Sequence, residues 1–175
     1  MLRIFDKIRR IGIVTEPVPA DLEPALSEVG EQVKAKVGEL FAGSLAIRQV
    51  DAGSCNGCEL EIHALANPYY GIERFGVHFV ASPRHADMLL VTGPVSRHME
   101  EALRRTYACT PDPKLVLAVG ECGATGGEFG TSYASCGPVS SVIPVDGVIR
   151  GCPPTPLDLL RGILEAIDRL PAKRR

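Results

Sequence analysis

The stretch LAIRQVDAGSCNGCELEIHALA, residues 45–66, decides the fold. Its apolar start, 45–50, predicts a strand, and the apolar spacing over 59–66 predicts a helix. A glycine-containing loop between them carries two cysteines three positions apart, Cys55 and Cys58. Strand, loop and helix in this order are typical of a parallel sheet, so the cysteine pair is expected just beyond the carboxyl end of a strand.

The same alternation of short apolar runs and helical stretches continues to the end of the chain. It predicts an α/β fold, a flavodoxin-like domain with a parallel sheet flanked by helices. In such folds ligands gather outside the carboxyl ends of the strands. The further strands are predicted at 77–81, 88–92, 114–119 and 142–145, and the further helices at 96–109 and 156–170.

Two helices are predicted ahead of the first strand. Residues 1–15 form a short basic amphipathic segment, which fits a helix on a membrane surface, a helix docked on a partner, or a helix covering the domain. Residues 25–41 have an apolar stripe that is expected to meet the core or a neighbouring subunit. We therefore expect an N-terminal helical extension over 1–44 and a cofactor-binding unit over 45–175.

Composition excludes several classes of protein. A chain of 175 residues that is 45% hydrophobic can bury one core, and its formal net charge of −2 offers no basic surface for nucleic acid. It has no apolar run of the roughly 18 residues needed to cross a bilayer. Only about five uncharged residues follow Arg9 and Arg10 before Glu16, too few for the apolar region of an export signal, so we expect a cytoplasmic location. Cysteines in such a chain are expected to be ligands rather than disulfides.

Two further cysteines follow later strands. Cys122 comes after the strand at 114–119 and Cys152 after the last predicted strand, so three loops can converge on one sheet edge with Cys55 and Cys58. Four thiolates fit a tetrahedral zinc ion or an iron–sulfur cubane. One close pair with two distant singles favours the cubane over zinc. A thioredoxin-type redox pair is a third reading, but it leaves the two later cysteines unexplained.

Four long runs resemble a known family. They are similar to the small subunit of membrane-associated, energy-converting [NiFe] hydrogenases, most of all the formate hydrogenlyase type, a group related to the 20 kDa subunit of respiratory complex I. The resemblance covers roughly residues 45–165. The runs are CNGCELEI (55–62), ERFGVHFVASPRHADMLLVTGPV (73–95), PDPKLVLAVGECGATGG (111–127) and IPVDGVIRGCPPTPLDLL (143–160).

The resemblance implies a cofactor and a ligand set. In the family a single [4Fe–4S] cluster is bound by cysteines matching Cys55, Cys58, Cys122 and Cys152, close to the active site of a separate large subunit. The complex I branch has adjacent cysteines in its first motif, whereas this chain has C-x-G-C. That difference favours the hydrogenase branch.

The resemblance also implies a role and partners. The chain is expected to be the electron-transfer subunit of an oxidoreductase, passing electrons from a ferredoxin-like subunit to the large subunit, where protons become dihydrogen. Integral membrane subunits complete such complexes, which places the chain on the inner face of the cell membrane. The alternative is a complex I-like quinone oxidoreductase or a hydrogenase-related ion-pumping subunit without nickel chemistry.

Four other residues carry lesser hypotheses. Glu61, three positions after Cys58, is a candidate proton relay or contact to the large subunit. Its alternative, purely structural role is to cap the start of the helix. Glu59 is expected to be an exposed acid in the first helical turn. Cys109 is expected to be buried as a small apolar residue. Cys136 is not expected to be a ligand, because the family does not use its position.

Overall fold

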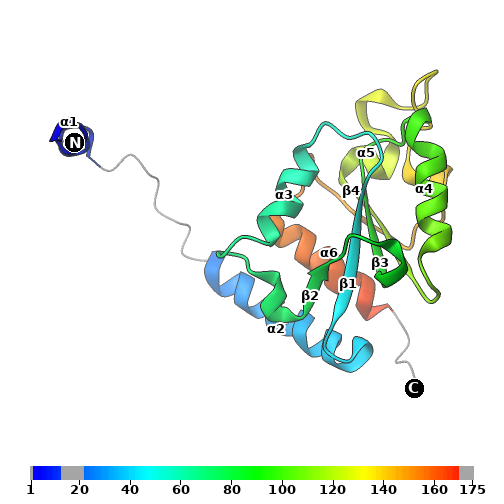
Figure 1. Cartoon of the computed structure of the whole chain (residues 1–175), viewed down its shortest axis with the longest axis horizontal. Helices are drawn as coiled ribbons and strands as arrows, with labels where there is room; N and C mark the ends of the chain where they lie inside the picture. The colour runs from blue at the N-terminus through cyan, green and yellow to red at the C-terminus, as the bar shows by residue number, and fades with distance from the viewer. Residues whose placement is uncertain (1, 13–21, 170–175) are drawn as a thin grey trace.

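A five-stranded parallel sheet forms the centre of the molecule (Figure 1). The computed structural model describes residues 2–12 and 22–169. The sheet order β2-β1-β3-β4-β5 is the flavodoxin-like order, and its switch point lies between β1 and β3. The predicted α/β class is confirmed. The strands are β1 (Leu45–Asp51), β2 (Val77–Phe79), β3 (Met88–Thr92), β4 (Leu115–Val119) and β5 (Gly147–Ile149).

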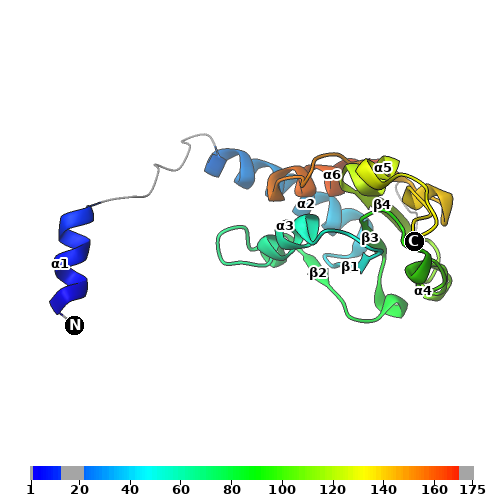
Figure 2. The ribbon, with the colours of Figure 1, turned by 90° about the horizontal axis from the view of Figure 1, so that it is seen from above.

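Helices cover both faces of the sheet, and the sheet separates two apolar cores. One core lies under α2, α3 and α6, and Figure 2 shows α2 and α6 side by side on that face. The other core lies under α4 and the segment 136–145. The helices are α1 (Leu2–Ile11), α2 (Leu22–Phe41), α3 (Gly57–Leu65), α4 (Arg97–Cys109), α5 (Gly120–Thr125) and α6 (Pro156–Asp168).

The central strands are buried on both sides. Every residue of β3, MLLVT, and of β4, LVLAV, is buried, which is why these strands read as continuous apolar runs rather than as an alternation. The helix after β5 is started by its own sequence. The Thr155 hydroxyl accepts from the Asp158 backbone N–H, the Asp158 carboxylate accepts from the Thr155 backbone N–H, and Pro156 occupies a first-turn position that needs no donor.

Helix α2 packs against the core on one face of the sheet. Its residues Leu26, Val33 and Val37 are buried in the same core as α6. The stripe predicted over 25–41 therefore meets the core, as expected. The division of the chain at residue 44 stays a prediction about folding units.

The last strand differs from its prediction. The apolar run predicted as a strand at 142–145 is loop after a short 3-10 turn, with Val142 and Ile143 buried against the second core, and β5 begins only at Gly147. Pro144 has no N–H for the ladder. Asp146 then binds Val116 through both its backbone N–H and its carboxylate, so pairing with β4 starts one residue later.

The packing of α2 generates a test with a control in the same helix. At Gly30 an added Cβ would lie 2.1 Å from Cζ of the buried Phe75 ring, whereas at Gly38 nothing lies within 4 Å. Alanine favours a helix over glycine by about 1 kcal/mol, and overpacking a core costs about 1–3 kcal/mol. We expect Gly38→Ala to raise the free energy of unfolding and Gly30→Ala to lower it, as measured by urea titration. A stabilising Gly30→Ala would contradict the packing of Phe75 on α2.

Candidate metal centre

The loop after β1 is shaped by short-range hydrogen bonds. The Asp51 carboxylate accepts from the backbone N–H groups of Gly53 and Ser54 at 2.8 and 3.0 Å, and the Ser54 hydroxyl accepts from Asn56 N–H at 3.1 Å. Asn56 then takes the left-handed conformation, with φ 73°, and α3 begins at the next residue. This turn places Cys55 in the loop and Cys58 in the first turn of α3.

The four predicted cysteines come together at the carboxyl edge of the sheet. The pKa of the Cys58 thiol is raised to about 11, first by burial and then by the neighbouring Glu59 carboxylate and the thiols of Cys55, Cys122 and Cys152. Burial also raises the pKa of Cys122, followed by Cys152 and Cys55. Cys58 and Cys122 therefore lie within electrostatic reach of each other and of Cys55 and Cys152, although the residues span almost a hundred positions of sequence.

Glycines allow the loops to approach the sulfurs. A Cβ on Gly120 would lie 2.7 Å from Cys58 Sγ, and one on Gly127 would lie 2.6 Å from Cys122 Sγ. Gly120 also has a φ of +78°, which side chains rarely adopt. The second and third loops are joined directly, because the Glu121 N–H donates to the Gly151 carbonyl at 3.0 Å. The three loops thus form a cradle around the thiols, in which a methyl group added at Gly120 or Gly127 would collide with a sulfur.

The cradle is open on one side. Cys58 is buried and Cys122 is half-buried, but Cys55 and Cys152 are exposed. Two large apolar side chains beside these loops are exposed as well, Leu60 at 63% and Phe129 at 65%. The chain therefore covers the inner half of the site and leaves the outer half to solvent or to a partner.

The donor set fits an iron–sulfur cubane. Within residues 2–12 and 22–169, no three His, Cys, Asp or Glu side chains are placed to hold one metal ion between them. A cubane makes a different demand, because each thiolate binds a separate iron and the sulfurs stand further apart than around a single ion. Four thiols from three glycine-rich loops, with backbone close to two of the sulfurs, supply the type and number of ligands that such a cluster uses.

Sequence reasoning missed the main buried acid of the site. Glu59 was expected to be exposed, but it is only 5% exposed and accepts a hydrogen bond from the Thr92 hydroxyl at the end of β3. Its second carboxylate oxygen, Oε2, is buried without a protein partner. The prediction was wrong because α3 starts immediately at the cysteine loop, so its first turn faces the sheet edge instead of solvent. The proximity of β3 to β1 in the sheet order was the signal that could have found this contact.

The other candidate residues, Glu61, Cys109 and Cys136, lie in three different environments. Glu61 is half-buried two residues beyond Glu59 and raises the pKa of Tyr70, after the larger effects of burial and of Tyr69. Its role as a proton relay stays a prediction. Cys109 is exposed at the end of α4, so the prediction that it is buried was wrong. Cys136 is buried and donates to Glu100 Oε2 at 3.3 Å.

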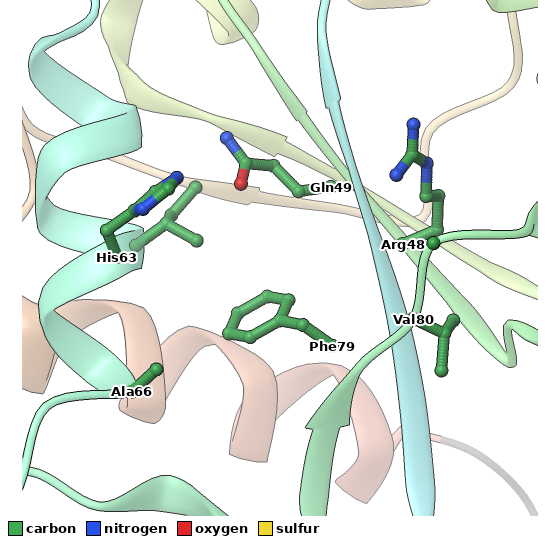
Figure 3. Close-up of a pocket in the computed structure, with 8 residues that line it drawn as sticks. Arg48, Gln49, His63, Ala66, Phe79 and Val80 are labelled. Atoms are coloured by element: carbon green, nitrogen blue, oxygen red, sulfur yellow. The ribbon is translucent and has the colours of Figure 1, made fainter.

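A separate pocket of about 340 Å³ lies between α3, β1 and β2. Figure 3 shows His63 of α3 and Gln49 of β1 beside it, with Phe79 of β2 below both, while Arg48 extends on the other side of β1. None of the four cysteines lines this pocket. It is therefore distinct from the cradle, although α3 contributes to both.

Comparison with known sequences places this architecture in a family. The family described as NADH ubiquinone oxidoreductase, 20 Kd subunit, matches residues 55–166, which include all four cysteines. The probable membrane-bound hydrogenase subunit mbhJ of Pyrococcus furiosus is 49% identical over 78% of this chain and 81% of its own length. Formate hydrogenlyase subunit 7 of Escherichia coli is 41% identical over 90% of this chain, which spans 60% of that relative's length.

Solved structures agree with the fold. A chain of the membrane-bound sulfane sulfur reductase, an archaeal respiratory membrane complex, superposes with a TM-score of 0.64 at 34% identity, covering 79% of this chain and 75% of that one. A chain of an NAD⁺-reducing [NiFe]-hydrogenase has a TM-score of 0.57 at 17% identity, covering 75% and 96%, and shares the fold. With these relatives and the match over 55–166, the chain belongs to the family of the complex I 20 kDa subunit and the [NiFe] hydrogenase small subunit, the oxidoreductase subunits of hydrogenase-like and complex I-like enzymes.

Proposed function

We propose that the chain is the electron-transfer subunit of a membrane-associated [NiFe] hydrogenase-type oxidoreductase. Cys55, Cys58, Cys122 and Cys152 would hold one [4Fe–4S] cluster, which supplies one-electron transfer when bound. The observation that carries the proposal is the meeting of these four thiols from three loops in a glycine cradle. The identity of 49% to a membrane-bound hydrogenase subunit supports the same reading.

The open side of the cradle supports a large-subunit partner. Exposed Cys55 and Cys152, flanked by exposed Leu60 and Phe129, form a surface that a second protein would have to cover to exclude water. A short path across that surface is what electron transfer to a partner's active site requires. A ferredoxin-like subunit would deliver electrons, and integral membrane subunits would complete the complex on the inner face of the cell membrane. Within the described residues, no helix is long and apolar enough to cross a bilayer.

Nearby carboxylates would set the electrostatics of the site. Glu59 raises the pKa of Cys58 after burial, and Glu128 and Glu121 raise that of Cys122 after burial and the neighbouring thiols. Negative potential at the sulfurs disfavours the addition of an electron, so we expect a low reduction potential. Arg150, paired with Glu121 at 3.0 Å, reduces the contribution of that one acid. This chain would thus set the distance for electron transfer, the burial of the cluster and the charge around it.

A second candidate function has its own support. At 34% identity the chain also resembles a subunit of a sulfane sulfur reductase complex, so a complex I-like or ion-pumping assembly without nickel chemistry is the alternative. The large subunit encoded with this chain decides between them. Two C-x-x-C pairs, near its two ends, would supply nickel ligands and favour the hydrogenase. Their absence would favour the alternative.

Iron and sulfide reconstitution under anaerobic conditions tests the ligand set. The chain should become brown, absorb near 400 nm, bind about four irons, and give an electron paramagnetic resonance signal on reduction. Cys122→Ser should lose most of that iron, because one corner of the cubane has no thiolate. Cys109→Ser, at an exposed cysteine on α4, should bind as much iron as the unaltered chain. Equal iron loss in both variants, or a colourless chain with one zinc, would overturn the proposal.

The glycine cradle gives a second test. Gly120→Ala should lower the iron content at least twofold, because its Cβ would occupy the space 2.7 Å from Cys58 Sγ. Gly43→Ala is the matched control: it has a similarly positive φ, +91°, and nothing within 4 Å of the added carbon. Both changes should lower the melting temperature through backbone strain, about 1–3 kcal/mol each. If both variants bind iron equally well, the close approach at Gly120 does not shape the site.

The Thr92 contact links α3 to β3 and so fixes the position of Cys58. Thr92→Val removes the hydroxyl that donates to Glu59 and leaves a buried carboxyl group without any partner. We expect the free energy of unfolding of the metal-free chain to fall by about 1–3 kcal/mol in urea titration. Thr106→Val, which removes a solvent-facing hydroxyl on α4, should change it by less than about 0.5 kcal/mol. Similar values for the two variants would refute this anchoring role.

A further inference from the structure

Helix α1 presents an apolar face that no other part of the described chain covers. Its side chains Ile4, Phe5, Ile8 and Ile11 are 62%, 67%, 59% and 52% exposed. Neither apolar core of the described residues includes a residue of α1. Four large apolar side chains on one short helix are costly to leave in water, so this face is built to meet something else.

Basic side chains line both edges of that face. At 3.6 residues per turn, the four apolar residues fall within an arc of about 120°. Lys7 lies next to Ile11 at one edge of the arc, and Arg9 lies next to Phe5 at the other; both are exposed. Such a helix can bury its apolar face while long cationic side chains reach up to a charged layer on either side.

The charge of α1 is opposite to that of the rest of the chain. The helix has four basic residues and one acid, Asp6, which pairs with Arg10 at 3.0 Å. Because the whole chain has a formal net charge of −2, everything outside α1 is net acidic. An anionic surface would therefore attract α1 more strongly than the rest of the chain taken together.

We propose that α1 binds the surface of an anionic phospholipid membrane and lies in the plane of the interface. This deepens the proposed function, on which it rests for placing the chain in a membrane-associated complex. Ten residues of helix span about 15 Å, half of the apolar thickness of a bilayer, so α1 lies on the membrane and does not cross it. A protein groove would bury the same apolar face, but it would not require cations along both edges. A lipid surface supplies acyl chains and anionic headgroups together.

Vesicle flotation of the full-length chain, loaded with iron as above, tests the proposal. The chain should float with vesicles of phosphatidylcholine and phosphatidylglycerol, and at least about fivefold less with phosphatidylcholine alone or in 0.5 M salt. The double change Phe5→Ser with Ile8→Ser should weaken binding to both kinds of vesicle at least about tenfold. Lys7→Glu with Arg9→Glu should weaken binding to the anionic vesicles by a similar factor. Tyr133→Ser, at a 98% exposed aromatic residue, and Arg105→Glu, at an exposed basic residue on α4, are the matched controls and should bind normally.

A fluorescent probe reports the location of α1 directly. The chain has no tryptophan, so Phe5→Trp gives a single emitter on the apolar face. Its emission should shift to shorter wavelength on anionic vesicles and be quenched by brominated acyl chains. No flotation of the unaltered chain, flotation unaffected by the α1 changes, or a shift that occurs only with partner subunits would overturn the proposal. Iron content measured on the same samples reports the cluster separately, so either proposal can fail alone.

Discussion

The candidate site depends on the close approach of three backbone segments at one edge of a parallel sheet. Strand order 2-1-3-4-5 brings the carboxyl ends of β1, β3, β4 and β5 to that edge. The loops that follow these strands lie so close together that a side chain does not fit between their backbones at several glycines. Gly93 lies against Ser54 and Gly120 against Cys58, each at a distance that a Cβ would violate, and Gly151 lies as closely against Pro154 of its own loop. Glycine at these positions is therefore what allows sulfurs from distant parts of the chain to share one space.

Burial is graded across the site, and this grading has an electrostatic consequence. Cys58 is the innermost thiol, and its pKa is raised the most clearly, to about 11, first by burial. Beneath it the Glu59 carboxyl group is held by Thr92 in a nearly dry position. On the outer side Cys55 and Cys152 are exposed. An electron added at this site would thus interact with fixed protein groups on the inner side. On the outer side, the polarity of its surroundings depends on what covers the exposed thiols.

Sequence reasoning reached the fold and the grouping of the cysteines because both follow from local patterns. The runs at 88–92 and 114–119 correspond closely to β3 and β4, since strands buried on both faces are continuously apolar. The run at 45–50 corresponds to β1, which also carries Arg48 and Gln49 and is only partly buried. The strand at 142–145 failed because Val142 and Ile143 are buried from a loop, and burial alone does not distinguish a strand from a packed loop. The prediction that Glu59 is exposed failed for a related reason. Its buried environment is formed with Thr92, thirty-three residues away, and so depends on which strands are neighbours in the sheet.

Two parts of the chain carry groups that its own fold leaves unsatisfied. At the cysteine cradle, exposed thiols and exposed Leu60 and Phe129 flank a buried inner half. On α1, a fully apolar arc lies between Lys7 at one edge and Arg9 at the other. Isolated domains rarely retain such surfaces, because exposed apolar area lowers solubility without adding stability. Both are physically reasonable in a subunit whose stability and electrostatics are completed by assembly: protein would close the low-dielectric side of the redox site, and an anionic interface would bind the helix. Because the rest of the chain is acidic in sum, its charge favours an orientation in which α1 meets the anionic surface.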